Sequence, residues 1–333
     1  MSTVLGRLAK GWSLLMQTLP IMGVRLGIYV AFAVGIGIYL LVFAGLAWLF
    51  GQWGWIVMLI AIVGLGGIWI WVRRYLLYMV QAAHVAVMTE LIVHKELPKG
   101  VSQYQYGKDI ITNNVKDISI LFAVDALVAG ILKAFTRSVA NIVDFLPLPG
   151  IEKAATAVMK IIDRSLTYVD EAIFSYWLTK RDKQTLWASA KDGVILYAQC
   201  WKELLKAAVG IWVVGAISFF ALLVLFLIPG LVVGYFFESM KFPVAIFVIA
   251  SAYVIHVAIY EPLGLAAMIV TFREETQDME PDPVWDERLS GVSSKFSELK
   301  DRAAESMTQW TSRDAPKDKP AEPVAPQKAV LNG

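Results

Sequence analysis

Two long apolar runs near the carboxyl end of the chain decide the fold. They read AAVGIWVVGAISFFALLVLFLIPGLVVGYFF (Ala207–Phe237) and PVAIFVIASAYVIHVAIYEPLGLAAMIVTF (Pro243–Phe272), and the short polar turn Glu238-Ser239-Met240-Lys241 lies between them. A helix crosses a hydrocarbon core of about 30 Å with about 20 apolar residues. Each run exceeds that length, so the sequence predicts a transmembrane hairpin over residues 206–273.

A second hairpin is predicted earlier in the chain, over residues 23–73. Its spans run from Val24 to Phe50 and from Trp53 to Trp71, with only Gly51-Gln52 between them. Cations flank the outer ends of both hairpins, at Lys10, Arg25, Arg73, Arg74, Lys202, Lys206 and Arg273. Because Lys and Arg collect on the cytoplasmic side of a membrane, we expect a multi-pass protein of the cytoplasmic (inner) membrane with both termini in the cytoplasm.

The composition of the chain also indicates a membrane protein. Of the 333 residues, 57% are hydrophobic and 17% are charged, against about 45–50% and about 25% in soluble domains. A net charge of +2 gives no reason to expect a nucleic-acid partner. The sequence therefore predicts an all-α, polytopic helical membrane protein with two transmembrane hairpins, four main spans and the lipid bilayer as its first partner.

Signatures of catalysis and cofactor binding are missing from the sequence. Cys200 is the single cysteine, and the three histidines, His84, His94 and His256, show no ligand spacing. No phosphate-binding loop, nucleophile elbow or His-Glu-x-x-His motif occurs. We therefore expect no enzyme activity, no metal and no cofactor.

The segments outside the hairpins are predicted to be interfacial. Residues 1–22 form an amphipathic helix that either lies in the headgroup plane or packs against the first span. Residues 74–205 form interfacial and partly inserted helices, in which Ile118–Phe135 is either an interfacial helix or a fifth crossing. The apolar face predicted for the first helix consists of Val4, Leu5, Leu8, Trp12, Leu15 and Leu19.

The carboxyl-terminal tail is predicted to be cytoplasmic. Residues 274–310 form an amphipathic helix, and residues 311–333, rich in Pro, Lys, Asp and Ala, are disordered. An apolar seam at 4-3 spacing predicts a coiled coil, or a helix on the membrane or on the protein's own cytoplasmic face. A second copy or a cytoplasmic protein is the partner expected for 284–310. The seam consists of Trp285, Leu289, Val292, Phe296, Leu299, Ala303, Ser306 and Trp310.

A carboxylate inside the last span is the strongest functional signal. Glu261 directly precedes Pro262, and a charge at the centre of a span costs about 2.5–3.5 kcal/mol on insertion scales. One interpretation is a proton or cation site on a polar path; the other is a packing hydrogen bond or a hydrated group near the interface. The residues proposed for the polar path are Glu261, His256, Tyr260, Asp125 and Lys133.

A second group of charges lies in the middle region. Asp163, Arg164, Asp170 and Glu171 are placed to form ion pairs at helical spacing. Exposed pairs of this kind contribute about 0–1 kcal/mol, so a solvated cytoplasmic cluster is the ordinary interpretation and a site is the alternative.

Two elements in this half of the chain resemble the choline transporter-like family. Ser189–Leu196, read as Ser-Ala-Lys-Asp-Gly-Val-Ile-Leu, resembles the family's Ser-Ala-Lys run before a late hairpin. Asp163-Arg164 with Tyr168 resembles its Asp-Arg-x-x-Tyr element, with the tyrosine one residue further on. The resemblance covers at most Asp163–Phe272 and implies transport, although the family has ten spans. The chain is also similar to uncharacterised bacterial inner-membrane proteins in Tyr168–Glu171 and Ala190–Gly193, which implies no known activity.

Three functional hypotheses follow. The first is a transporter or channel for a small solute or ion, and it is suggested by the ionisable residues that lie in apolar helices. The second is a non-transporting membrane scaffold or partner-recruiting protein of the cell envelope. The third is a lipid-binding or lipid-scrambling protein, which the interfacial helices would suit.

Overall fold

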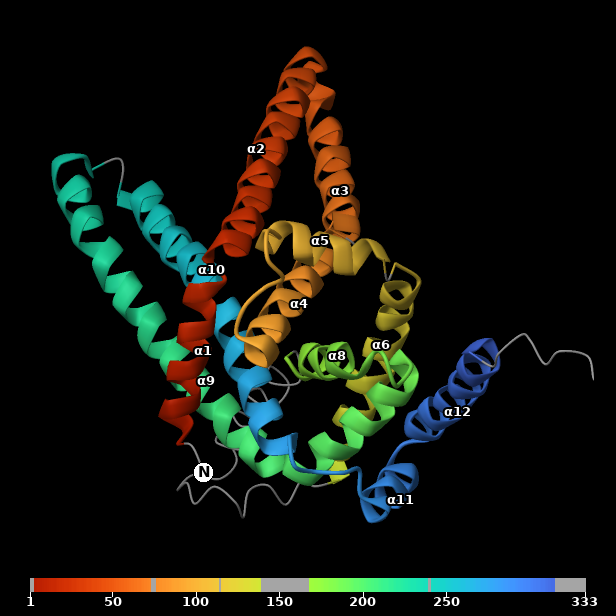
Figure 1. Ribbon diagram of the computed structural model, residues 1–333. Coiled ribbons are helices and arrows are strands. Elements are labelled where there is room, and N and C mark those ends of the chain that lie inside the picture. Colours follow the sequence, from red (N-terminus) through yellow and green to blue (C-terminus); the bar gives the residue numbers. More distant parts are fainter. Residues whose placement is uncertain (1–2, 73–75, 114, 139–167, 239–240, 315–333) are drawn as a thin grey trace, which may run out of the picture.

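The computed structural model describes residues 3–72, 76–113, 115–138, 168–238 and 241–314 (Figure 1). Every element in these ranges is a helix. Four helices are long and apolar enough to cross a membrane: α2 (Leu19–Leu49), α3 (Gly54–Val72), α9 (Leu186–Phe236) and α10 (Lys241–Thr276). The prediction of an all-α chain with four membrane-type spans is confirmed.

The first hairpin consists of α2 and α3, joined by the short helix η1 (Gly51–Trp53). Gly51 has a φ of 53°, which glycine adopts without strain. A Cβ atom on Gly54 would lie 2.2 Å from the carbonyl oxygen of Ala47. The tight turn predicted from Gly51-Gln52 therefore depends on glycine at two positions.

The second hairpin consists of α9 and α10, which cross closely at two glycines. A Cβ atom on Gly230 would lie 2.6 Å from Val248, and one on Gly215 would lie 2.3 Å from the ring of Tyr260. Helix α9 begins well before the predicted span, at Leu186, and departs from helical geometry at Cys200. Both helices of this hairpin therefore extend into the rest of the molecule.

The remaining helices form a body with its own apolar core. They are α1 (Val4–Gln17), α4 (Tyr78–His94), α5 (Gln103–Asn113), α6 (Val115–Ser138) and α8 (Val169–Lys180), packed around the first half of α9 and the end of α10. Figure 1 shows both hairpins projecting from this body. Helix α6 buries Val128, Ile131 and Leu132 in the core and is not among the four candidate spans found in the described ranges. It fits the interfacial alternative for Ile118–Phe135 rather than a fifth crossing.

Burial marks the level at which the hairpins leave the body. Arg25, Ile211 and Tyr260 are buried, whereas large apolar side chains are exposed on the next turns outward, at Leu26, Trp212 and Ile259. We call the level of these three buried residues the junction. At about 1.5 Å per residue, the four helical stretches beyond the junction are about 28 to 38 Å long. Their lengths match a hydrocarbon core of about 30 Å.

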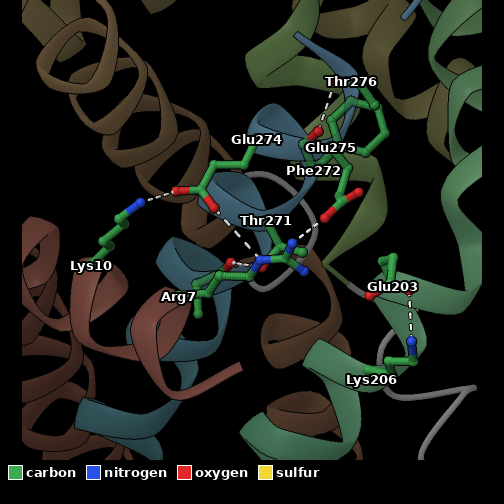
Figure 2. Close-up of polar contacts among 10 residues, drawn as sticks. Arg7, Lys10, Glu203, Lys206, Thr271, Phe272, Glu274, Glu275 and Thr276 are labelled. Carbon is green, nitrogen blue, oxygen red and sulfur yellow. Dashed lines mark hydrogen bonds and ion pairs between the residues drawn. The ribbon is translucent and has the colours of Figure 1, made fainter. Parts of the chain in front are cut away.

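Helix α1 presents only part of its predicted apolar face to the molecule. Leu15 is fully buried and Leu8 packs on the core, but Leu5, Trp12 and Leu19 are exposed, and Arg7 and Gly11 face inward. A Cβ atom on Gly11 would lie 2.8 Å from the backbone of Ala267, so α1 packs directly on α10 and not on the first span. Figure 2 shows the cause: the guanidinium of buried Arg7 binds Glu274 and Glu275 at the end of α10, and Lys10 also binds Glu274. Close backbone contact and ion pairing outweigh the apolar stripe.

The tail forms α11 (Pro283–Val292) and α12 (Ser294–Asp314), which return to the body. Of the predicted seam, Leu289, Phe296, Leu299 and Ala303 are buried, and α12 packs against α6 and α9. The structure thus matches the alternative in which the seam lies on the protein's own face. A partner of 284–310 would meet the opposite face of these helices.

Candidate functional site

The carboxylate of Glu261 meets a cation at the junction. Arg25 Nη2 of α2 donates a hydrogen bond of 3.2 Å to Glu261 Oε2 of α10. Arg25 is buried, and the Glu261 side chain is 39% exposed. The carboxylate therefore lies beside the body, near the end of the span, and not in the middle of the bilayer. No partner for it was evident in the sequence, because Arg25 lies 236 residues away.

The charge of Arg25 also acts on the interior of the body. It lowers the pKa of Glu171 on α8, although burial is the larger effect on that group and raises its pKa to about 7. Burial, with a smaller contribution from Arg25, lowers the pKa of His84 on α4 to about 3. The charge of Arg25 therefore acts on residues of two helices of the body.

We define the carboxyl cluster as Asp125 on α6 with Asp170 and Glu171 on α8. Each of the three acids shifts the pKa of at least one of the others, and Asp125 and Asp170 line one small cavity. The side-chain amide of Gln81 on α4 donates to Glu171 Oε1. Three helices of the body therefore meet at these acids.

The carboxyl cluster holds protons at neutral pH. Burial and neighbouring like charges both disfavour the ionised form of a carboxyl group. Burial and the neighbouring Asp170 raise the pKa of Asp125 to about 8. Burial and the Glu171 charge raise the pKa of Asp170 well above its usual range. The cluster can therefore take up and release protons near pH 7 to 8.

The surroundings of the carboxyl cluster are largely apolar. A cavity of about 10 Å³ touches Tyr78, Asp125 and Asp170, a volume at the lower limit for one water molecule. Burial and the nearby carboxyls raise the pKa of Tyr78, so its phenol stays neutral. Asp170 Oδ1 and Glu171 Oε2 have no hydrogen-bond partner within the part of the chain that the structure describes. Water or a proton is what this site can accommodate.

His84 is a packing residue with a defined tautomer. It is fully buried, and its Nε2 lies 2.9 Å from Thr18 Oγ1. The Thr18 hydroxyl donates to the Leu15 carbonyl oxygen at 3.0 Å, so Nε2 of His84 carries the proton and donates to Thr18. With its lowered pKa the ring stays neutral and links α4 to the start of α2.

The other predicted site residues lie elsewhere. His256 Nδ1 lies 3.2 Å from Ser218 Oγ, and its ring stacks on Tyr260 at 4.8 Å, within the second hairpin. Lys133 is exposed on α6. Asp163 and Arg164 fall outside the described residues. The structure thus separates the polar path proposed from the sequence into the hairpin pair His256 and Tyr260, an exposed lysine, and a buried network.

The buried network joins acids that the sequence assigned to two different groups. Glu261 and Asp125 belonged to the proposed path, and Asp170 and Glu171 to a solvated ion-pair cluster. Asp170 and Glu171 instead lie in the interior, beside Asp125. Sequence reasoning missed Arg25, Tyr78 and Gln81. Arg25 was recognisable in the sequence as a cation at the start of an apolar segment, but it was used only to predict the membrane topology.

Among the described residues, no group of three or more His, Cys, Asp or Glu side chains is placed to hold a metal ion. Comparison of the chain with protein-family models, with curated proteins and with solved structures finds no match.

Proposed function

We propose that this chain is a membrane-anchored protein without a conduit, and that the helical body on the cytoplasmic side is its working part. One observation carries the proposal. The ionisable network of Arg25, Glu261 and the carboxyl cluster lies at or inside the junction, where a bilayer around the hairpins ends.

The spans beyond the junction favour an anchor. A path for an ion or polar solute needs polar groups along its length. From Leu26 to Val72 the sequence contains no charged residue or histidine. In the second hairpin, His256 and Ser218 are hydrogen-bonded to each other. Glu261, the residue that suggested transport, is neutralised by Arg25.

The distribution of cations supports a cytoplasmic body. Lys241, in the turn of the second hairpin, is the only Lys or Arg in the sequence beyond the junction, and it pairs with Glu238. Within the ranges that the structure describes, all other Lys and Arg residues lie on the body or at its edge. By the positive-inside rule, the body and both ends of the chain lie in the cytoplasm.

A flux measurement tests the proposal. The full chain is reconstituted into liposomes that contain a pH-sensitive dye, and a proton gradient is imposed with and without a potassium diffusion potential. We expect proton uptake equal to that of protein-free liposomes, both for the natural sequence and for Glu261→Gln. Gramicidin added at the end verifies that the liposomes are sealed. Proton flux that requires the protein and falls with Glu261→Gln would overturn the proposal in favour of a transporter.

A further inference from the structure

A large cavity lies in the body on the side of α8 opposite the carboxyl cluster. It has a volume of about 540 Å³, within the range of about 300–1,000 Å³ that is typical of small-molecule sites. Its wall comes from the end of α4, from α8, from the turn after α8 and from the end of α10. We call it the basic cavity because three cations line it.

Three cations line the basic cavity, and no acid is among its described lining residues. They are Lys180 at the end of α8, Lys183 in the following turn, and Arg273 on α10. None of the three forms an ion pair with a residue that the structure describes. Lys180 lies over the ring of Tyr176 at 4.9 Å. Cations that converge on one concave surface create a positive potential that concentrates anions.

The acids that directly follow Arg273 and those at the start of α8 are engaged elsewhere. Glu274 and Glu275, which directly follow Arg273, bind Arg7 and Lys10 of α1 (Figure 2). On α8, the acids belong to the carboxyl cluster, while Ser175, Tyr176 and Thr179 face the cavity. Both helices therefore direct their acids away from the basic cavity and leave its cations for a ligand.

The lining is only partly polar. Tyr176 and Phe272 meet edge to face at 6.3 Å and both line the cavity, together with Ile269 and Met279. A bare inorganic ion would leave this apolar wall without a contact. The chemistry that fits is a phosphate group, which arginine binds through two parallel hydrogen bonds, joined to an apolar or planar organic group.

We propose that the basic cavity binds a small organic phosphate. Such a group has two sources, a soluble metabolite and a lipid headgroup. Arg273 follows Glu261 by twelve residues of continuous helix, which places it about 18 Å further into the body. That distance from the junction favours a soluble ligand. The proposal goes beyond the anchoring function, and a protein that transports protons could equally have this site.

Calorimetry on the full chain tests the proposal, with ATP and inorganic pyrophosphate as probes. The protein is held in nanodiscs of phosphatidylcholine alone, so that no anionic lipid competes. We expect ATP to bind with a Kd below the millimolar range and pyrophosphate to bind more weakly. Arg273→Gln and Lys183→Gln should each weaken ATP binding at least tenfold, and Lys99→Gln, which removes an exposed cation outside the cavity, should change it less than twofold.

The outcomes separate the alternatives. Lys183 is exposed, so its variant tests the site even where Arg273→Gln fails to fold. Absence of binding by both probes at millimolar concentration, or equal binding by the natural sequence and Lys183→Gln, would overturn the proposal. Loss of ATP binding in nanodiscs that contain phosphatidylglycerol would assign the cavity to a lipid headgroup and overturn the soluble ligand.

Discussion

Arg25 on α2 and Glu261 on α10 are joined by a 3.2 Å hydrogen-bonded ion pair that ties the bases of the two hairpins together. Arg25 is buried, so its charge depends on this carboxylate and on the acids of the body for compensation. Glu261, which is an isolated charge in an apolar run of the sequence, therefore contributes to the contact that links the two hairpins at the body. Predictions about stability and function begin from this contact.

Removing one partner of the pair should destabilise the protein. Arg25→Gln leaves Glu261 without its cation, and we expect a loss of about 1–2 kcal/mol, below the cost of breaking a fully buried pair because Glu261 is partly hydrated. Thermal unfolding in detergent measures the loss. Lys241→Gln breaks the exposed pair with Glu238 and is the matched control, with a much smaller effect expected. Equal effects of the two variants would show that the Arg25 pair contributes no more than a surface pair.

The carboxyl cluster should make stability depend on pH. Folding raises the pKa of Asp125 from 3.8 to about 8, so the native state binds more protons than the unfolded state between these values. Stability should therefore fall as the pH rises from about 4 to about 8. Asp125→Asn keeps a donor for Asp170 but cannot ionise, so its melting temperature should exceed that of the natural sequence at pH 8 by a few degrees.

The comparison at two pH values distinguishes this effect from a general gain in stability. At pH 4 the melting temperatures of Asp125→Asn and the natural sequence should agree much more closely, because Asp125 is then largely protonated in the unfolded state as well as in the native state. Asp109→Asn, which changes an exposed carboxylate on α5, should leave the pH profile unaltered. A parallel shift of Asp125→Asn at both pH values would contradict a buried, protonated Asp125.

Close contact between α1 and α10 should make Gly11 sensitive to a single methyl group. Gly11→Ala places its Cβ 2.8 Å from the backbone of Ala267, so α1 must shift, and overpacking of this kind costs about 1–3 kcal/mol. Gly23→Ala on α2 meets nothing within 4 Å and should be neutral or stabilising by up to about 1 kcal/mol. Thermal unfolding and limited proteolysis of the amino-terminal segment measure both. Equal stability of the two variants would place α1 away from α10.

The orientation of the body can be measured by cysteine labelling in a Cys200→Ser background. Gln52 is exposed at the turn of the first hairpin and Glu287 is exposed on α11. In intact cells an impermeant maleimide should label Gln52→Cys, and it should label Glu287→Cys only after the membrane is opened. Labelling of Glu287→Cys from outside would place the body on the external face and exclude the proposed topology.

Much of the architecture was accessible from the pattern of residues along the chain. Long apolar runs with short turns predict the two hairpins, because a span must satisfy its backbone internally and cover it with apolar side chains. The seam at 289–303 predicted an amphipathic helix that buries one face. In both cases the determining property is local, since it depends on neighbours within one helix.

The candidate site was predicted only in part. Glu261 and Asp125 were chosen because acids in apolar surroundings are costly, and Asp170 and Glu171 because their helical spacing favours ion pairs. Both reasons depend on local sequence alone. Their partners were not predicted, since Arg25 lies on another helix and Gln81 carries no charge. The face of α1 was predicted only in part, because its orientation also depends on Gly11 and Arg7 meeting α10, more than 250 residues away in the sequence.

The sequence by itself determined that this is a helical chain with four apolar segments of membrane-spanning length, and where those segments lie. Tertiary structure alone decided that Glu261 has a partner, that three acids come together inside the body, and that three cations face one cavity. The physical reason is the range of the interactions. Hydrophobicity and helix geometry act between near neighbours, whereas the charge of a buried group is decided by whatever distant segments fold against it.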